Sequence, residues 1–290
     1  MNPAAFAYHR AASLDEAIAL LGEHGDGAKL LAGGHSLLPV MKLRLAEPAH
    51  LIDISRIDAL RGARDEGGEL RIGALTTHHA LTREPLVAER APLLAAAAAV
   101  VGDRQVRNRG TLGGALAHAD AAADEPAAIL ALRGRMIARG PKGEREISAD
   151  DFFVEFLTTA LAPDEVLTEI AIPVLPARSG ASYQKLANQA SGYAIVGVAA
   201  VVALDVAGRC ADASIAITGA SSVVQRASAA EAALRGSDLG ADAIAKAAAQ
   251  ATEGLVPLDD IHASGEYRLQ VTRGLVRRAL QAAADRARRT

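Results

Sequence analysis

The chain has 290 residues, half of them hydrophobic, which is enough apolar material for two or three compact units. Its formal net charge of −3 gives no electrostatic reason to expect nucleic acid or an acidic membrane as a partner. Cys210 is the only cysteine, which excludes an internal disulfide and an iron–sulfur cluster built from this chain alone.

The longest apolar run, residues 194–204, is much shorter than the roughly 20 residues that a membrane-spanning helix needs, and it predicts a buried strand. The first residues lack a basic segment followed by an apolar one, so no secretory signal is expected. We therefore expect a cytoplasmic protein with no membrane span.

Residues 1–58 are predicted to form a small α/β unit. Ser13 followed by Glu16 is a capping box, and the apolar residues at 14, 18 and 21 share one face of the helix that it starts. A strand over 29–32 leads into the sequence Ala32-Gly33-Gly34-His35-Ser36. A helical turn over 36–45 and a strand over 51–54 follow.

Residues 59–176 are predicted to form a second, larger unit. A strand over 70–73 precedes a helical region over 76–101, which Pro85 and Pro92 interrupt. The sequence Thr111-Leu112-Gly113-Gly114 comes next, before apolar segments over 127–132, 135–138, 151–157 and 166–172. A proline-rich joint over 172–176 ends the unit.

Residues 177–290 are predicted to begin with strands over 182–186, 194–205 and 210–218, with Gly208 in the turn between the last two. From residue 225 the chain is rich in alanine and predicted to be helical, ending in a basic helix over 267–289. Strands followed by helices are typical of an α+β unit. The chain as a whole is therefore predicted to be α+β, with an antiparallel sheet and its helices at the C-terminal end.

Two glycine turns carry the functional information: the first glycine turn is Ala32–Ser36 and the second is Thr111–Gly114. Paired glycines let a backbone approach a ligand without a Cβ in the way, and successive N–H groups in such a turn form an anion site. If the two turns converge, they can hold a pyrophosphate from both sides. A bare glycine pair is more often an ordinary chain reversal, but the strand before the first turn and the hydroxyl group of Ser36 favour a binding role.

Several nucleotide and hydrolase sites are disfavoured. The first turn is not Gly-x-Gly-x-x-Gly, and we expect no acidic residue to end a following strand at the offset that a dinucleotide site requires, which argues against a nicotinamide Rossmann site. No Gly-x-x-x-x-Gly-Lys sequence is present, and Ser36 and Ser191 lack convincing His and Asp partners. The basic run 104–109 is interpreted as a solvated loop or a partner-facing patch, and adjacent His78 and His79 as exposed.

Three polar residues follow the second turn, namely His118, Asp120 and Asp124. They do not form a metal-ligand pattern, so no metal is expected there. Asp124 is interpreted as a carboxylate that accepts hydrogen bonds from the sugar hydroxyls of a nucleotide. The alternative is that it caps the helix predicted to start near Pro126.

Three segments, in this order, resemble the FAD-binding medium subunits of the molybdenum hydroxylases. They are Ala-Gly-Gly-His-Ser-Leu-Leu-Pro-Val-Met-Lys from residue 32, Arg-Gly-Thr-Leu-Gly-Gly from residue 109 and Ala-Asp-Ala-Ala-Ala-Asp-Glu-Pro-Ala from residue 119. The resemblance covers nearly the whole chain. It is greatest to the flavoprotein subunit of aerobic carbon monoxide dehydrogenase, and the flavin domain of xanthine dehydrogenase is also similar.

The resemblance implies a two-lobed FAD-binding domain, residues 1–58 and 59–176, followed by a C-terminal domain of the carbon monoxide dehydrogenase flavoprotein type, residues 177–290. FAD would lie between the lobes, with its pyrophosphate held by both glycine turns, and Tyr193 would lie near the isoalloxazine ring unless it is a buried hairpin tyrosine. No catalytic residue of the chain is implied. The FAD-binding residues carried over by position are Leu30, Leu31, Ala32, Gly33, Gly34, His35, Ser36, Leu37, Val101, Thr111, Leu112, Gly113, Gly114, Ala115, Asp124, Leu167, Lys185 and Tyr193.

The resemblance also implies an oxidoreductase subunit that works inside a larger enzyme. A small partner with two [2Fe–2S] clusters would supply electrons, FAD would pass them to an external acceptor, and a large molybdopterin-binding subunit would oxidise the substrate, in a dimer of heterotrimers. An aerobic carbon monoxide dehydrogenase-type complex is the first expectation. The alternatives are the medium subunit of an N-heterocycle or aldehyde hydroxylase, a self-sufficient FAD oxidase, or a scaffold subunit that has lost its cofactor.

Overall fold

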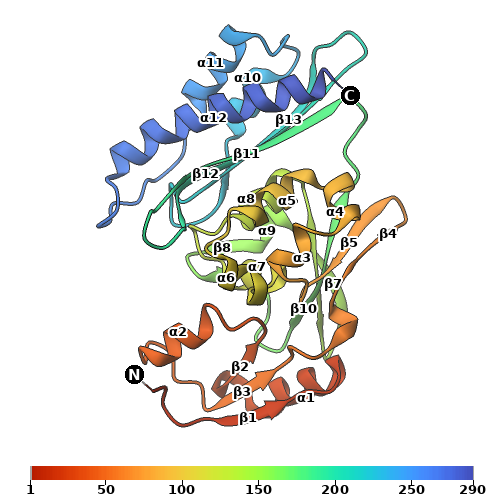
Figure 1. Ribbon diagram of the computed structural model, residues 1–290, viewed down its shortest axis with the longest axis vertical. Helices are drawn as coiled ribbons and strands as arrows, with labels where there is room; N and C mark the ends of the chain where they lie inside the picture. Colours follow the sequence, from red (N-terminus) through yellow and green to blue (C-terminus); the bar gives the residue numbers. More distant parts are fainter. Residues whose placement is uncertain (1, 290) are drawn as a thin grey trace.

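A computed structural model describes residues 2–289, which fold around a three-stranded, a five-stranded and a four-stranded sheet. The three sheets follow one another along the long axis of the molecule in chain order, with helices packed on each (Figure 1). The predicted α+β architecture in three parts is confirmed, while the exact boundaries at 58/59 and 176/177 stay predictions. No helix within residues 2–289 is both long enough and apolar enough to cross a bilayer.

The small lobe at the N-terminal end is a parallel sheet in the order β1-β3-β2 with α1 packed on one face. The predicted capping box is present in a shifted form: the Ser13 hydroxyl accepts from the Glu16 N–H at 3.2 Å, and the Glu16 carboxylate accepts from the N–H of Ala12, the residue before the cap, at 2.7 Å. The elements of the lobe are β1 (Ala7–Arg10), α1 (Leu14–His24), the 3₁₀ turn η1 (Gly25–Gly27), β2 (Ala28–Leu31), α2 (Leu37–Lys42) and β3 (His50–Asp53).

The middle lobe is an antiparallel sheet in the order β4-β5-β10-β6-β7, in which β10 is the central strand. Pro85 and Pro92 are the first residues of two short helices, a position where proline costs no hydrogen bond. The strands are β4 (Ala63–Glu66), β5 (Glu69–Gly73), β6 (Arg135–Gly140), β7 (Gly143–Ser148), β8 (Phe153–Glu155), β9 (Thr158–Thr159) and β10 (Val166–Pro173). The helices are η2 (Asp58–Leu60), α3 (His78–Leu81), α4 (Pro85–Arg90), α5 (Pro92–Ala99), α6 (Arg104–Arg109), α7 (Leu112–His118), α8 (Glu125–Ala131) and α9 (Ala149–Phe152).

The basic run 104–109 is helix α6, so the interpretation of this run as a loop is wrong. The Asp103 carboxylate accepts from the Val106 N–H at 2.8 Å and caps the helix. The Arg107 guanidinium donates to the carbonyl oxygens of Val101 and Gly102, which fixes the turn that leads into the helix. The basic side chains therefore partly serve local structure.

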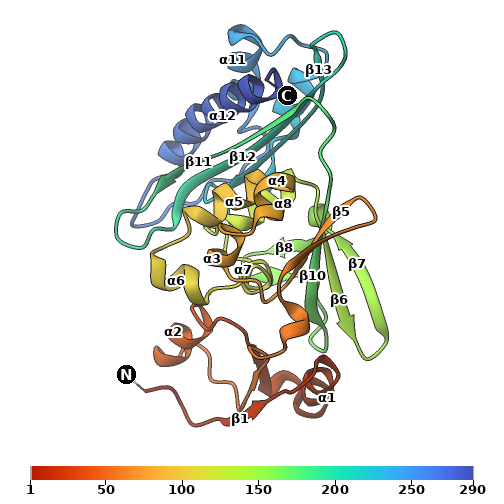
Figure 2. The same cartoon turned by 45° about the vertical axis from the view of Figure 1, so that its right-hand side comes forward.

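The C-terminal lobe is an antiparallel sheet in the order β11-β12-β13-β14 with the long helix α12 lying across β11 and β12 (Figures 1 and 2). Alternate residues of β12 belong to two different cores. Val198 and Ala200 pack with α12, whereas Ala199 and Val201 share a core with α5 and α8 of the middle lobe. Burial on both faces explains the continuous apolar run of β12. The elements are β11 (Ser179–Ala187), β12 (Ala194–Leu204), β13 (Cys210–Thr218), β14 (Gln225–Arg226), α10 (Ser228–Leu234), α11 (Ala241–Gln250) and α12 (Gly265–Ala287).

Candidate functional site

The two glycine turns lie side by side. A Cβ on Gly33 would be 2.8 Å from the carbonyl carbon of Arg109, closer still to its oxygen, and 2.9 Å from Cα of Gly110. Only glycine allows this approach, because a backbone cannot rotate away as a side chain can. The first turn therefore packs directly on the residues that open the second turn, and the predicted convergence of the turns is confirmed.

The first glycine turn offers free backbone donors. It follows β2, and Gly34 has φ of +79°, in the left-handed region that favours glycine. Within residues 2–289, no group accepts a hydrogen bond from the backbone N–H of Gly33, Gly34, His35 or Ser36. Unpaired N–H groups need a partner, and a consecutive row of them suits an anionic group such as a phosphate.

The second glycine turn differs, because the N–H groups that follow Thr111 are already used. Thr76, Ala74 and the Thr111 hydroxyl accept from the N–H groups of Leu112, Gly113 and Gly114 at 2.9, 2.8 and 3.2 Å, and the Ala115 N–H donates to the Thr111 carbonyl at 3.0 Å. The expectation that N–H groups of both turns hold one pyrophosphate is therefore wrong for the N–H groups of Leu112 to Ala115. Two donors remain: the backbone N–H of Thr111, which has no acceptor within residues 2–289, and the hydroxyl hydrogen of Thr111.

Gly113 is explained by packing. A Cβ on this residue would lie 2.5 Å from the Cβ of Ala74, so glycine is needed for α7 to sit against the end of β5. The second Gly-Gly pair thus positions the helix and the Thr111 hydroxyl, whereas the first pair leaves its donors open.

Both turns line a cavity of about 750 Å³, a size in the ordinary range for cofactor sites. All three lobes contribute to its wall, because the segment 191–193 between β11 and β12 reaches it from the C-terminal lobe. Two predicted residues are not on the wall: Leu112, which is fully buried in the core, and Lys185. The predicted residues on the wall are Leu30, Leu31, Ala32, Gly33, Gly34, His35, Ser36, Leu37, Val101, Thr111, Gly113, Gly114, Ala115, Asp124, Leu167 and Tyr193.

Asp124 is a buried residue of the cavity wall, and its side chain is hydrogen-bonded to the C-terminal lobe. Its Oδ1 accepts from the Tyr183 hydroxyl at 2.6 Å, and its Oδ2 accepts from Lys185 Nζ at 2.7 Å. Lys185 also donates to the carbonyl oxygen of Val100 at 3.0 Å. Burial raises the pKa of Asp124 to about 7, although Lys185 and Tyr183 act in the opposite direction.

The alternative role of Asp124 as a helix cap is wrong, because its side chain accepts no N–H of α8. Lys185 is not on the cavity wall, but its ammonium group binds the Asp124 carboxylate, which is. Lys185 therefore affects the site by holding Asp124 in position. Contact of Asp124 with a sugar hydroxyl stays a prediction.

His78 is buried, so the expectation that it is exposed is wrong, whereas His79 is exposed. Its Nδ1 lies 2.6 Å from Oε1 of Glu125, which is also fully buried. Burial lowers the pKa of His78, but the charge of Glu125 outweighs it and the pKa is raised. Its Nε2 faces Gly110, where a Cβ would lie 2.5 Å away. The His78–Glu125 pair therefore packs against Gly110, the residue before the second turn. The two residues are far apart in the sequence, and only the tertiary fold brings them together.

Asp53 is the last residue of β3, at the offset from the first turn that a dinucleotide site requires, so the expectation of no acidic residue there is wrong. The Tyr8 hydroxyl donates to its Oδ2 at 2.6 Å and the Ser55 N–H donates to its Oδ1 at 2.8 Å. Burial acts to raise the pKa of Asp53, but these hydrogen bonds prevail and lower it. Its carboxylate serves the small lobe and is not on the cavity wall.

Tyr193 lies at the mouth of the cavity and is 42% exposed, so the alternative of a buried hairpin tyrosine is wrong. Burial of part of the ring raises the pKa of its phenol, and the side chain of Ser36 in the small lobe lowers it in part. The neighbouring Gly192 packs on Gly102, where a Cβ would be 3.0 Å from the Cα of Gly102. This segment therefore joins the three lobes around the opening.

Comparison with known families identifies both parts of the chain. Residues 4–175 match the FAD binding domain in molybdopterin dehydrogenase, and residues 181–283 match the CO dehydrogenase flavoprotein C-terminal domain. The chain belongs to the FAD-binding molybdopterin dehydrogenase family. The resemblance seen in the sequence is therefore confirmed, and the chain is an FAD-binding oxidoreductase subunit of the molybdenum hydroxylase type.

Three relatives match the chain over nearly its whole length. The chain is 41% identical to the 6-hydroxypseudooxynicotine dehydrogenase complex subunit alpha of Paenarthrobacter nicotinovorans, covering 100% of this chain and 98% of that one. A solved carbon monoxide dehydrogenase from Hydrogenophaga pseudoflava superimposes with a TM-score of 0.96 at 44% identity, covering 99% of each chain. Quinoline 2-oxidoreductase from Pseudomonas putida 86 superimposes with a TM-score of 0.93 at 37% identity, also covering 99% of each chain.

The residues present fit the family's cofactor. The first turn supplies free N–H groups at a backbone that carries no side chain at Gly33, and the cavity beside it has the volume for a dinucleotide-sized ligand. Apolar wall residues such as Leu31 and Leu167 are suited to contact with aromatic rings.

Proposed function

We propose that this chain holds FAD in the cavity and relays electrons from the [2Fe–2S] clusters of a small partner subunit to an external acceptor. A large molybdopterin-binding subunit would oxidise the substrate. The observation that carries the proposal is the row of unpaired N–H groups in the first glycine turn, open to a cavity of about 750 Å³. A bound flavin supplies the ability to take electrons singly and release them in pairs.

The residues have separate tasks in this proposal. The N–H groups of Gly33 to Ser36 bind the pyrophosphate, and the Thr111 hydroxyl donates from the opposite side. Leu167 and Val101 contact apolar parts of the cofactor, and Asp124 accepts from a sugar hydroxyl. Lys185 is a positioning residue, because it fixes Asp124.

The assembly we propose is a dimer of heterotrimers in the cytoplasm. Exposed apolar side chains close in sequence to cavity-wall residues support a partner. Leu43 and Leu45, which follow the wall residue Val40, are 55% and 75% exposed, and Phe156, next to the wall residue Leu157, is 56% exposed. Apolar exposure of this kind marks protein interfaces. We assign this face to the electron donor.

The first proposed substrate of the complex is carbon monoxide, as in an aerobic carbon monoxide dehydrogenase. The second candidate is an N-heterocycle, as in a hydroxylase of such compounds. Identity is 41% both to the carbon monoxide dehydrogenase medium chain of Hydrogenophaga pseudoflava and to the 6-hydroxypseudooxynicotine dehydrogenase subunit, which favours the second candidate as much as the first. Anaerobic addition of carbon monoxide or of an N-heterocycle to the complex separates them, because only the true substrate bleaches the flavin absorbance.

The relay is tested with the purified chain and with the complex. The chain should carry one FAD, identified after extraction, and should co-purify with a molybdenum subunit and an iron–sulfur subunit when the three are expressed together. A colourless chain that takes up no added FAD would contradict the proposal. Turnover of a small organic substrate by the isolated chain would instead support the self-sufficient oxidase.

Replacing Tyr193 with alanine should increase the rate at which oxygen oxidises the reduced flavin several-fold, with FAD still bound. The reason is that the ring covers the cavity mouth, while the pyrophosphate is bound by backbone N–H groups of the first turn, which this substitution does not remove. Stopped-flow measurement of reoxidation checks this, with Tyr193→Phe as the matched control that keeps the ring. An unchanged rate in Tyr193→Ala would place the flavin ring away from this residue.

A further inference from the structure

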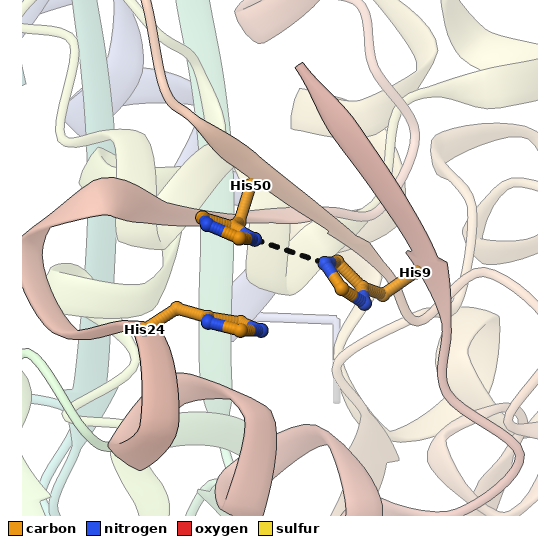
Figure 3. A group of neighbouring side chains, drawn as sticks. All are labelled: His9, His24 and His50. Atoms are coloured by element: carbon orange, nitrogen blue, oxygen red, sulfur yellow. Dashed lines mark hydrogen bonds between the residues drawn. The ribbon is translucent and has the colours of Figure 1, made fainter.

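Three histidines from different elements of the small lobe meet on one face of its sheet. His9 lies in β1, His24 is the last residue of α1 and His50 is the first residue of β3 (Figure 3). One nitrogen atom from each ring lies within 4.8 Å of the other two. The Nε2 of His9 is 3.0 Å from Nδ1 of His50, and the rings of His24 and His50 stack with centroids 3.7 Å apart.

One nitrogen of this cluster lacks a partner. The Nε2 of His24 is buried and makes no hydrogen bond within residues 2–289, and the nearest carboxylate oxygen, Oε1 of Glu23, is 4.0 Å away. A buried polar atom without a partner is costly, and native structures rarely leave one without a bound water or ion. The orphaned nitrogen is adjacent to the other two rings, so a single ligand can satisfy all three.

The close approach of the three rings disfavours a charge on all of them at once. Burial lowers the pKa of His50, and the neighbouring His24 and His9 lower it further, whereas Glu23 acts weakly in the opposite direction. Three rings this close cannot all be protonated without mutual repulsion. Neutral imidazole nitrogens are the form that binds transition metals.

We propose that His9, His24 and His50 bind one divalent transition-metal ion, with Zn²⁺ as the best fit. Zn²⁺ takes imidazole nitrogens at about 2.0–2.1 Å in a tetrahedral arrangement, with the Glu23 carboxylate or a water as the fourth ligand. The ion takes the place of the hydrogen bond between His9 and His50: the ring that donates this bond changes tautomer, so its proton sits on its other nitrogen and both facing nitrogens offer a lone pair. The stacked rings of His24 and His50 rotate so that their lone pairs converge on the ion.

The site is structural and separate from the cofactor. None of the three histidines is on the cavity wall. His50 begins β3, whereas the first glycine turn follows the last residue of the parallel strand β2, so the cluster and that turn lie at opposite ends of the same small sheet. The ion ties together β1, α1 and β3 in a lobe too small to have a large core of its own. The sequence showed no such site, because the three histidines have no ligand spacing and only the fold unites them.

The test uses the full-length, untagged, FAD-loaded chain after removal of metal with a chelator. Calorimetric titration should give one Zn²⁺ per chain, and Co²⁺ should give tetrahedral absorption bands at wavelengths longer than those of flavin. Zn²⁺ should also raise the temperature of thermal unfolding by several degrees. His24→Ala and His50→Ala should each weaken Zn²⁺ binding by at least about tenfold. His262→Ala is the matched control, because His262 is exposed and outside the cluster.

Absence of Co²⁺ bands and of stoichiometric Zn²⁺ binding in the wild-type chain would overturn the proposal without recourse to any variant. Equal loss of binding in His262→Ala would also overturn it. FAD content, read from the flavin absorbance, should stay the same in all three variants, so this outcome is independent of the electron-relay proposal.

Discussion

Replacing Gly33 with alanine is expected to weaken FAD binding about tenfold to a hundredfold. The new Cβ would collide with the Arg109 carbonyl group, whose carbon would be 2.8 Å away and whose oxygen would be closer. The obstacle is backbone, so the turn itself must move, and overpacking of this kind costs about 1–3 kcal/mol. Movement of the first turn displaces its free N–H groups from the cavity. The flavin-to-protein absorbance ratio and titration of the apo chain with FAD measure the effect.

Gly22→Ala is the matched control for Gly33→Ala. Gly22 lies inside α1, and a Cβ there would meet nothing within 4 Å. Alanine is the better helix former by about 1 kcal/mol, so this variant should keep FAD and unfold at a slightly higher temperature. Wild-type FAD affinity in Gly33→Ala would show that the turns need not touch for the cofactor to bind.

Replacing Lys185 with methionine is expected to destabilise the chain strongly at alkaline pH. The lysine and its partner Asp124 are both buried, with side chains 6% and 4% exposed, so the change leaves a buried carboxylate without its cation. Breaking a buried pair in this way costs about 3–5 kcal/mol. Thermal unfolding followed by circular dichroism measures the loss.

The pH dependence of this effect has a definite sign. The folded pKa of Asp124, about 7, lies above the unfolded value near ~3.9, so its ionisation costs stability as the pH rises through this window, and the cost is complete above it. Loss of Lys185 raises that pKa further, which extends the window upward. The difference in unfolding temperature between wild type and Lys185→Met should therefore be small at acidic pH and grow towards alkaline pH.

The double variant Asp124→Asn with Lys185→Met is the control, since it contains neither charge. The double variant should recover part of the stability that Lys185→Met loses. Its difference in unfolding temperature from the wild type should not grow towards alkaline pH. A Lys185→Met chain that is destabilised equally at every pH would show that packing and the hydrogen bond to Val100, rather than the Asp124 charge, account for the loss.

The sequence predicts most of the fold because its signals are local. The capping box at Ser13, the prolines that begin α4 and α5 and the apolar run of β12 each act within a few residues. The helix over residues 104–109 is the exception. The basic composition of this run indicates a loop, whereas the hydrogen bond from the Val106 N–H to the Asp103 carboxylate caps a helix.

The site is predicted less completely because its contacts join distant segments. Motif order places FAD between the turns, but it does not reveal that Thr76 and Ala74 already accept from the N–H groups of the second turn. The same limit applies to the burial of His78, whose partner Glu125 belongs to another helix, and to the histidine cluster. Sequence alone identifies which residues are candidates, and tertiary hydrogen bonds decide which donors remain available.

Strand β12 has a consequence for how the molecule comes apart. Its two faces complete the hydrophobic interiors of adjacent lobes, with Val198 on one side and Ala199 on the other. Unfolding of either lobe therefore removes β12 from the hydrophobic core of the other lobe and exposes that core to water. Heat or denaturant should therefore dismantle these two regions in a single cooperative step, and a fragment ending before this strand would present a sticky apolar face instead of an independent flavoprotein.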